Sequence, residues 1–169
     1  MFIVTFGLPG SGKSFFADHL AAALALPHLK SDEVRDQLQK RGAYDSQSKA
    51  AVYHALFSQA AEALQTQQAV IVDATFHQAW MREIAYETAE RHHKPLRFIE
   101  LQASEATIQQ RVNRSRPDSD ADLTVYHELR REAEPFPTAH LILHSDQMPV
   151  ATMLAEAYQY LNLTPAPNS

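Results

Sequence analysis

Eight residues close to the start of the chain, Gly7 to Ser14, constrain its fold more than any other stretch. Their sequence, Gly-Leu-Pro-Gly-Ser-Gly-Lys-Ser, fits the pattern G-x-x-x-x-G-K-[ST]. The apolar, β-branched run from Met1 to Phe6 predicts a buried strand before them. Apolar residues recur at helical spacing from Phe15 to Ala25, directly after them. Strand, glycine-rich turn and helix are the context that a phosphate-binding loop requires, so we expect this stretch to bind the phosphates of a nucleotide.

Each part of this loop has an expected task. Backbone N–H groups of Gly10 to Ser14 would surround the β-phosphate, at the positive end of the following helix dipole. Lys13 would reach the β- and γ-phosphates, and the Ser14 hydroxyl would hold Mg²⁺. The residues expected to bind the nucleotide are Gly7, Leu8, Pro9, Gly10, Ser11, Gly12, Lys13 and Ser14.

Composition narrows the class of protein. The chain has 169 residues, of which 45% are hydrophobic, so we expect one domain over residues 1–163 and a disordered tail over residues 164–169. It has no cysteine, which excludes disulfides and zinc–thiolate sites and is compatible with a cytoplasmic location. We expect neither a secretory signal nor a membrane helix. A net charge of −5 argues against a protein that coats long nucleic acids, but not against a local basic pocket.

Strand-like and helix-like stretches alternate along the chain. Strands are expected at residues 1–6, near 26–29, and at 69–73, 96–101 and 140–144. Helices are expected at residues 15–25, 31–40 (with Ser31 as N-cap), from 46 to about 64, and at 76–92, 104–114, 121–133 and 151–161. This order predicts an α/β protein: a three-layer P-loop NTPase fold with a five-stranded parallel sheet, helices on both faces and a short arginine-bearing lid. Ligands of such sheets bind beyond the carboxyl ends of the strands.

Two acids fall at that edge of the sheet. Asp73 ends an apolar strand, as expected of a Walker-B-type acid that holds Mg²⁺ through water or orders Ser14, although an Asp also commonly begins a turn there. Asp32 lies where a carboxylate could deprotonate an acceptor hydroxyl, and Arg35 follows it at i+3 on the same helical face. The pair is also compatible with a simple helix start and a surface ion pair.

Three arginines, Arg111, Arg114 and Arg116, run from a helix into a break at Pro117. A mobile arginine can stabilise the negative charge that spreads over a phosphoryl group during its transfer, so we interpret the cluster as a lid. Arg111 could instead stack on the nucleotide base. Cations that complement a helix dipole at a solvated helix end are the alternative to both roles.

Together, these features resemble the small P-loop kinases of the polynucleotide-kinase branch of the AAA-type ATPase and kinase family. Zeta toxins and chloramphenicol phosphotransferase are more distantly similar. The resemblance covers the chain to about residue 145. Besides the loop it rests on Ser31-Asp32-Glu33-Val34-Arg35, Val70-Ile71-Val72-Asp73-Ala74-Thr75, Arg82, the lid arginines, Ser119-Asp120-Ala121 and Glu134-Pro135.

The resemblance implies an ATP- and Mg²⁺-dependent kinase that transfers a phosphoryl group directly to a hydroxyl. Asp32 would be the general base and Arg35 would bind a phosphate of the acceptor. Asp73 and Thr75 would line the acceptor or metal side. Arg114 or Arg116 would close over the migrating group and Arg111 would lie nearer the adenine, although the arginine spacing of three and two departs from the pattern of the family.

The acceptor stays open between two classes at this point. The Asp32/Arg35 pair favours a 5′-hydroxyl end of RNA or DNA, because Arg35 could bind the neighbouring phosphate. The acidic balance and the lack of an aromatic–basic groove favour a small alcohol, such as a nucleoside, a sugar or an antibiotic. A third possibility is an ATPase or nucleotide-dependent switch without an acceptor.

Overall fold

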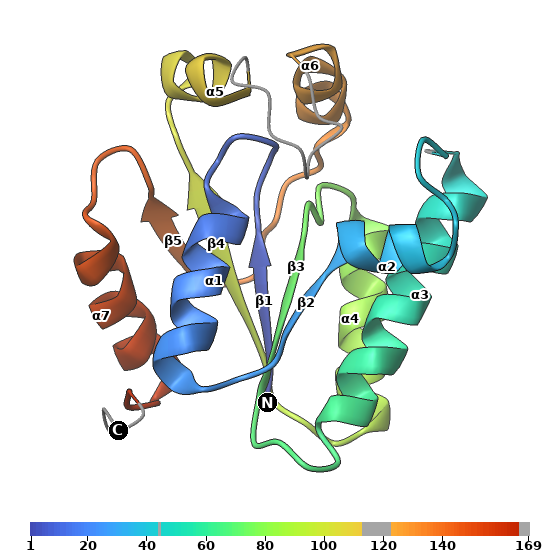
Figure 1. Ribbon diagram of the computed structural model, residues 1–169, viewed down its shortest axis with the longest axis vertical. Helices are drawn as coiled ribbons and strands as arrows, with labels where there is room; N and C mark the ends of the chain where they lie inside the picture. The colour runs from blue at the N-terminus through green and yellow to red at the C-terminus, as the bar shows by residue number, and fades with distance from the viewer. Residues whose placement is uncertain (44, 113–122, 166–169) are drawn as a thin grey trace.

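A computed structural model of the chain describes residues 1–43, 45–112 and 123–165 (Figure 1). Five parallel strands form one sheet in the order β2-β3-β1-β4-β5. The strands are β1 (Phe2–Phe6), β2 (His28–Lys30), β3 (Val70–Ala74), β4 (Leu96–Gln102) and β5 (Leu141–His144). The described helices are α1 (Lys13–Leu24), α2 (Ser31–Gln37), α3 (Ser46–Ala63), α4 (Ala79–Arg91), α5 (Glu105–Val112), α6 (Leu123–Glu132) and α7 (Val150–Leu161). The predicted α/β architecture is confirmed.

Successive residues of the inner strands point to opposite faces of the sheet, which gives the fold three layers. Phe2 and Val4 belong to the core beneath α3 and α4, whereas Ile3, between them, belongs to the core beneath α1 and α7. Figure 1 shows these two helical layers on either side of the sheet. Every residue of β1 and β3 is buried, which explains why both sequences are apolar at almost every position.

The starts of α2 and α4 differ from the prediction for reasons that the structure shows. Ser31 was expected as the N-cap of α2, but β2 stays extended through Lys30, so Lys30 occupies the cap position and Ser31 is the first helical residue. The helix expected from residue 76 begins only at Ala79, because Phe76 has a φ of 47° and a left-handed residue cannot continue a right-handed helix.

The register of the sheet aligns the carboxyl ends of three strands. Asp73 of β3 is the pairing partner of both Thr5 on β1 and Lys30 on β2. Gly7, Thr75 and Asp32 each follow two residues after a member of this row. The phosphate loop and the predicted acceptor-side residues therefore leave the sheet side by side, at its upper edge in Figure 1.

Candidate active site

Glycines shape the loop at residues 7–12 through conformation and close contact. Gly7 has a φ of 146°, and a Cβ atom there would collide with the Leu101 carbonyl oxygen. Gly12 has a φ of 91°, and a Cβ atom there would lie 3.1 Å from the Ser145 Oγ. Residues with a side chain rarely adopt these conformations, and an added Cβ would collide with backbone at Gly7 and be crowded at Gly12. The glycines of the motif are therefore required by the backbone of the loop itself.

Helix α1 presents its amino end to this loop. Gly12 is its N-cap, without a capping side chain, and no acid lies in its first turn. The side chains of Lys13 and Ser14 form no hydrogen bond or ion pair with the described part of the chain. Unpaired N–H groups at a helix N-terminus, together with a free ammonium and hydroxyl, suit a phosphate ligand.

Arg111 and Ser145 brace the loop from the other side. The Arg111 guanidinium donates to the Gly10 carbonyl oxygen (3.1 Å), the Ser145 Oγ (2.8 Å) and the Ser145 carbonyl oxygen (3.2 Å). The Ser145 hydroxyl donates to the Ser11 carbonyl oxygen at 2.6 Å. Arg111 thus supports the loop in this structure, and its expected place near an adenine stays a prediction.

Sequence reasoning missed Ser145, although one signal was available. Ser145 directly follows β5, so the predicted order of strands already placed it at the ligand edge of the sheet. Asp146, the next residue, accepts a hydrogen bond from the backbone N–H of Ser104 at 2.7 Å and so holds the start of α5. Both residues connect the loop after β5 to parts of the candidate site.

Asp73 lies at the buried end of β3 with 3% of its surface exposed. Its Oδ2 is 3.7 Å from the His28 Nε2 on the neighbouring strand. Its Oδ1 is buried and has no hydrogen-bond partner among the described residues. A carboxylate oxygen held in this way suits a hard cation or its bound water. With the Ser14 hydroxyl at the same edge of the sheet, the residues present fit a Mg²⁺ ion.

The predicted pair Asp32 and Arg35 differs in burial. Asp32 is exposed in the first turn of α2, whereas Arg35 is 8% exposed. Arg35 donates from Nη1 to the Ala43 carbonyl oxygen at 2.7 Å, which fastens the turn that follows α2. The Asp32 carboxylate therefore lies at the surface, and the Arg35 guanidinium supports the backbone of the turn.

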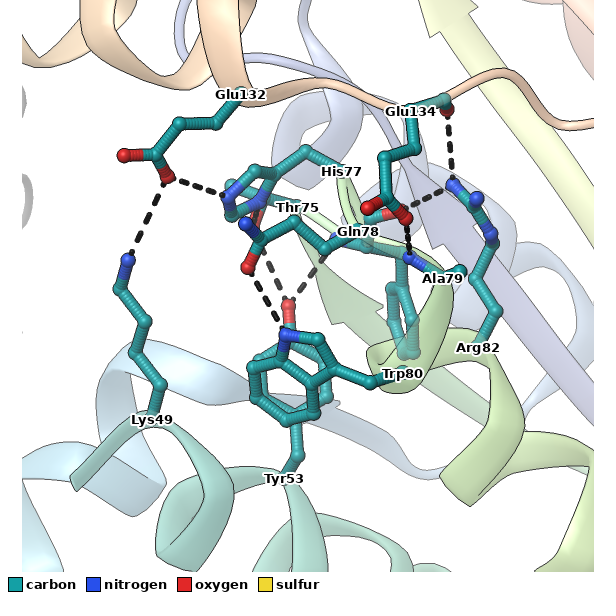
Figure 2. A network of polar contacts seen from close by, with 11 residues as sticks. Lys49, Tyr53, Thr75, His77, Gln78, Ala79, Trp80, Arg82, Glu132 and Glu134 are labelled. Carbon is teal, nitrogen blue, oxygen red and sulfur yellow. Dashed lines mark hydrogen bonds and ion pairs between the residues drawn. The ribbon is translucent and has the colours of Figure 1, made fainter. Parts of the chain in front are cut away.

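A chain of hydrogen bonds runs from Tyr53 of α3 through Thr75 to His77 (Figure 2). The Tyr53 hydroxyl accepts from the Phe76 N–H (3.1 Å) and lies 3.2 Å from the Thr75 Oγ1, which lies 3.1 Å from the His77 Nδ1. Burial raises the pKa of the Tyr53 phenol. Burial, and then the charge of Lys49, lower the pKa of His77. Both side chains are therefore neutral near pH 7, and neutral His77 can accept from Thr75.

The carboxyl end of α6 and the segment after it are attached to the same region (Figure 2). Glu132 lies 3.6 Å from the His77 Nε2 and 3.9 Å from the Lys49 ammonium. Glu134 accepts from the Ala79 N–H at 2.5 Å and so caps α4, whose own N-cap residue makes no capping bond. Arg82 donates to the carbonyl oxygens of Glu134 and Pro135. These contacts fix the base of α6 beside Thr75.

A hollow of about 270 Å³ lies between the phosphate loop, the end of β4 and helices α5 and α6. Leu8, Glu100 and Tyr126 are among its lining residues. Arg130 of α6 pairs with Glu105 of α5 at 2.6 Å and so joins the two helices above it. Arg114 and Arg116, the expected lid arginines, lie outside the described residues.

Comparison with known proteins places this architecture in a family. The model of the AAA-domain family matches residues 2–136. No curated protein sequence matches the chain. No helix of the described segments is long and apolar enough to cross a membrane.

Solved kinases have similar structures at low sequence identity. A sugar kinase from Janibacter sp. HTCC2649 gives a TM-score of 0.75 at 15% identity, over 96% of this chain and 94% of that chain. A gluconokinase from Sinorhizobium meliloti 1021 gives 0.72 at 19% identity, over 95% and 90%. The APS kinase of Mycobacterium tuberculosis, bound to AMPPNP and APS, gives 0.73 at 15% identity, over 95% and 96%. The family model covers well over half of the sequence, so the chain belongs to the AAA-domain family and has a P-loop NTPase fold.

Proposed function

We propose that this protein is an ATP- and Mg²⁺-dependent kinase that transfers the γ-phosphoryl group to a hydroxyl of a small acceptor. The observation that carries the proposal is the aligned row of Thr5, Asp73 and Lys30. It brings the phosphate loop, a buried acid and the exposed carboxylate of Asp32 to one edge of the sheet. A switch or simple ATPase needs the phosphate loop and the buried acid. A kinase also needs a carboxylate that can act on its acceptor, which Asp32 would supply.

The chain can carry out the transfer without a covalent intermediate. The loop N–H groups and Lys13 bind the β- and γ-phosphates and offset charge as the P–O bond to ADP breaks. Asp32 orients the acceptor hydroxyl and takes its proton while the oxygen bonds to phosphorus. Ser14 and Asp73 would hold Mg²⁺, which would supply positive charge to offset the charge of the phosphates. The lid arginines Arg114 and Arg116 are proposed to stabilise the migrating group.

Three observations support a small acceptor over a polynucleotide. The Arg35 guanidinium, which the sequence assigned to a phosphate of the acceptor, is buried and donates to the Ala43 carbonyl oxygen. Nearby Lys49 lies within ion-pair distance of Glu132. The kinases of similar fold also include a sugar kinase and a gluconokinase. With Arg35 and Lys49 both engaged, a neutral or weakly charged polyol suits this side of the site better than a phosphodiester chain does.

A polynucleotide 5′-hydroxyl end is the second candidate. Its support is the run Ser31 to Arg35, which resembles the polynucleotide-kinase branch at the position of the acceptor. In that case the Arg35 guanidinium would leave the Ala43 carbonyl to bind a phosphate. Thr75, whose hydroxyl contacts Tyr53 and His77, would line the acceptor in either case.

A transfer screen with γ-labelled ATP separates these possibilities. The acceptors would be sugars and sugar acids, nucleosides, and 5′-hydroxyl oligonucleotides of RNA and DNA, each with and without Mg²⁺. Labelled small product supports the first candidate, and labelled oligonucleotide supports the second. Release of free phosphate alone, with no labelled acceptor and no loss of rate in Asp32→Asn, would contradict both and favour the switch.

A further inference from the structure

His28 and Lys30 share one face of β2, because side chains two residues apart in a strand point the same way. Both reach Asp18 on α1: the His28 Nδ1 and the Lys30 Nζ each lie 3.0 Å from its Oδ1. Burial acts to raise the pKa of Asp18, but the hydrogen bond and charge of Lys30 outweigh it and leave that pKa below its usual value. Asp18 is thus an ionised anchor that fixes the plane of the His28 ring.

The other edge of the same ring faces Asp73. The His28 side chain is 8% exposed, and its Nε2 lies 3.7 Å from the Asp73 Oδ2. Among the described residues, His28 is the one side chain within ion-pair distance of Asp73. Thr5, beside Asp73 in the sheet, donates to the Val72 carbonyl oxygen at 3.5 Å. The Asp73 Oδ2 is therefore in contact with an anchored histidine ring, whereas its Oδ1 has no hydrogen-bond partner among the described residues.

We propose that His28 is a positioning residue for Asp73, which limits the rotation of this carboxylate so that Oδ1 stays available to the Mg²⁺ of a bound nucleotide. The distance of 3.7 Å between the His28 Nε2 and the Asp73 Oδ2 is longer than a hydrogen bond. The ring therefore restricts the carboxylate by occupying the space beside Oδ2. Residues behind metal ligands commonly set affinity by such orientation. The inference rests on the proposed use of a nucleotide with Mg²⁺, but it does not depend on any acceptor.

A simpler role for His28 is to tie α1 to β2 through Asp18. The two roles use opposite edges of the ring, so two amide substitutions distinguish them. An asparagine amide occupies the position of Nδ1 and keeps the contact with Asp18. A glutamine amide extends to the position of Nε2 and keeps the contact with Asp73. Positioning predicts that His28→Gln behaves like the wild type and that His28→Asn behaves like His28→Ala.

The measurement is the affinity of Mn²⁺ for the complex of the full chain with ADP, from the electron paramagnetic resonance of free Mn²⁺. His28→Ala and His28→Asn should weaken it about tenfold, the lower end of the effect of residues behind metal ligands. His28→Gln should stay within about twofold of wild type by the same reasoning. The affinity for ADP in EDTA should be equal in all variants, and His19→Gln, at an exposed histidine of α1, is the matched control.

The order of the variants decides the inference. An Mn²⁺ affinity for His28→Asn equal to or above that of His28→Gln would overturn it, and so would a matching loss of metal-free ADP affinity. A wild-type ADP complex that gains no Mn²⁺ site would remove the inference together with the metal part of the proposed function. Failure of the transfer screen with an intact His28 effect would remove only the acceptor part.

Discussion

Two regions of the candidate site are held in place differently. One is the proposed donor side, residues 7–14 with Arg111 and Ser145. The other is the proposed acceptor side, which consists of Asp32, Arg35, Tyr53, Thr75 and His77. The donor loop takes its shape from glycines, and its braces act on the carbonyl oxygens of Gly10 and Ser11. The acceptor side depends on side chains that bond to one another across α3, β3 and α6. The shape of the loop depends on its backbone, so most side-chain substitutions around it should leave its phosphate binding unchanged. The proposed acceptor side depends on side chains, so single substitutions there can change which acceptor binds.

Of the substitutions predicted here, removal of the Lys13 side chain should reduce phosphoryl transfer the most. Lys13→Ala should lower kcat for phosphoryl transfer by about 10³-fold or more, because a preorganised charge at the migrating group is lost. Stopped assays with γ-labelled ATP, at saturating acceptor, measure this loss. Lys94→Ala, at an exposed lysine before β4 and so at the opposite edge of the sheet, is the matched control and should keep wild-type activity. An active Lys13→Ala enzyme would remove Lys13 from the mechanism.

Replacing the base should affect the acceptor side alone. Asp32→Asn should lower kcat by about 10²–10⁴-fold, the usual contribution of a general base, with little change in the KM for ATP. The matched control is Asp36→Asn, an exposed acid one turn further along α2 that pairs with Arg41 at 3.7 Å. If Asp32→Asn instead raised the KM for ATP at an unchanged kcat, the carboxylate would belong to the donor side.

Two glycine substitutions test how strongly the loop backbone is constrained. Gly7→Ala should cost about 3 kcal/mol of unfolding free energy, since positive φ and a backbone collision act together. Gly42→Ala also has a positive φ, of 78°, but open space around it, so it should cost only about 1 kcal/mol. Urea unfolding measures both. Equal costs would show that the loop yields to the added methyl group.

The sequence predicted the fold and the place of the glycine loop at the edge of the sheet because both are encoded locally. Apolar runs and helical spacing alternate in chain order, and the glycine motif occupies eight adjacent residues. Ser145 contacts Ser11 from the far end of the chain, and the chain from Tyr53 to His77 exists only once α3 packs beside β3. No local sequence pattern predicts the left-handed conformation of Phe76, so the expected start of α4 was wrong.

Arg35 illustrates the limit of helical spacing as evidence. The i,i+3 spacing predicts that Asp32 and Arg35 share one helical face, but it does not say how deeply each side chain is buried. Both lie on α2, where Asp32 is exposed and Arg35 is buried. The short α2 is followed by a turn whose Ala43 carbonyl oxygen receives the Arg35 guanidinium. Burial of this kind depends on how a loop folds back, which neither residue type nor spacing determines.

The smallest predicted effect concerns pH and the neutral state of His77. Burial, with Lys49 and Arg82 nearby and Glu132 opposing them, lowers the pKa of His77 in the folded protein. The unfolded chain, with an ordinary histidine pKa near 6.5, then binds more protons as the pH falls below that value. The stability that neutral His77 contributes is therefore fully present above pH 6.5 and is lost as the pH falls toward the lowered pKa.

His77→Gln should flatten this part of the stability curve. Its unfolding free energy should depend less on pH than that of the wild type below pH 6.5, by less than the one-proton limit of about 1.4 kcal/mol per pH unit. Urea unfolding at intervals from pH 7.5 to pH 5 measures the difference, and His54→Gln, at an exposed histidine of α3, should leave the curve unchanged. A steeper curve for His77→Gln would mean that Glu132 keeps His77 charged, in which case the His77 Nδ1 would donate to the Thr75 Oγ1.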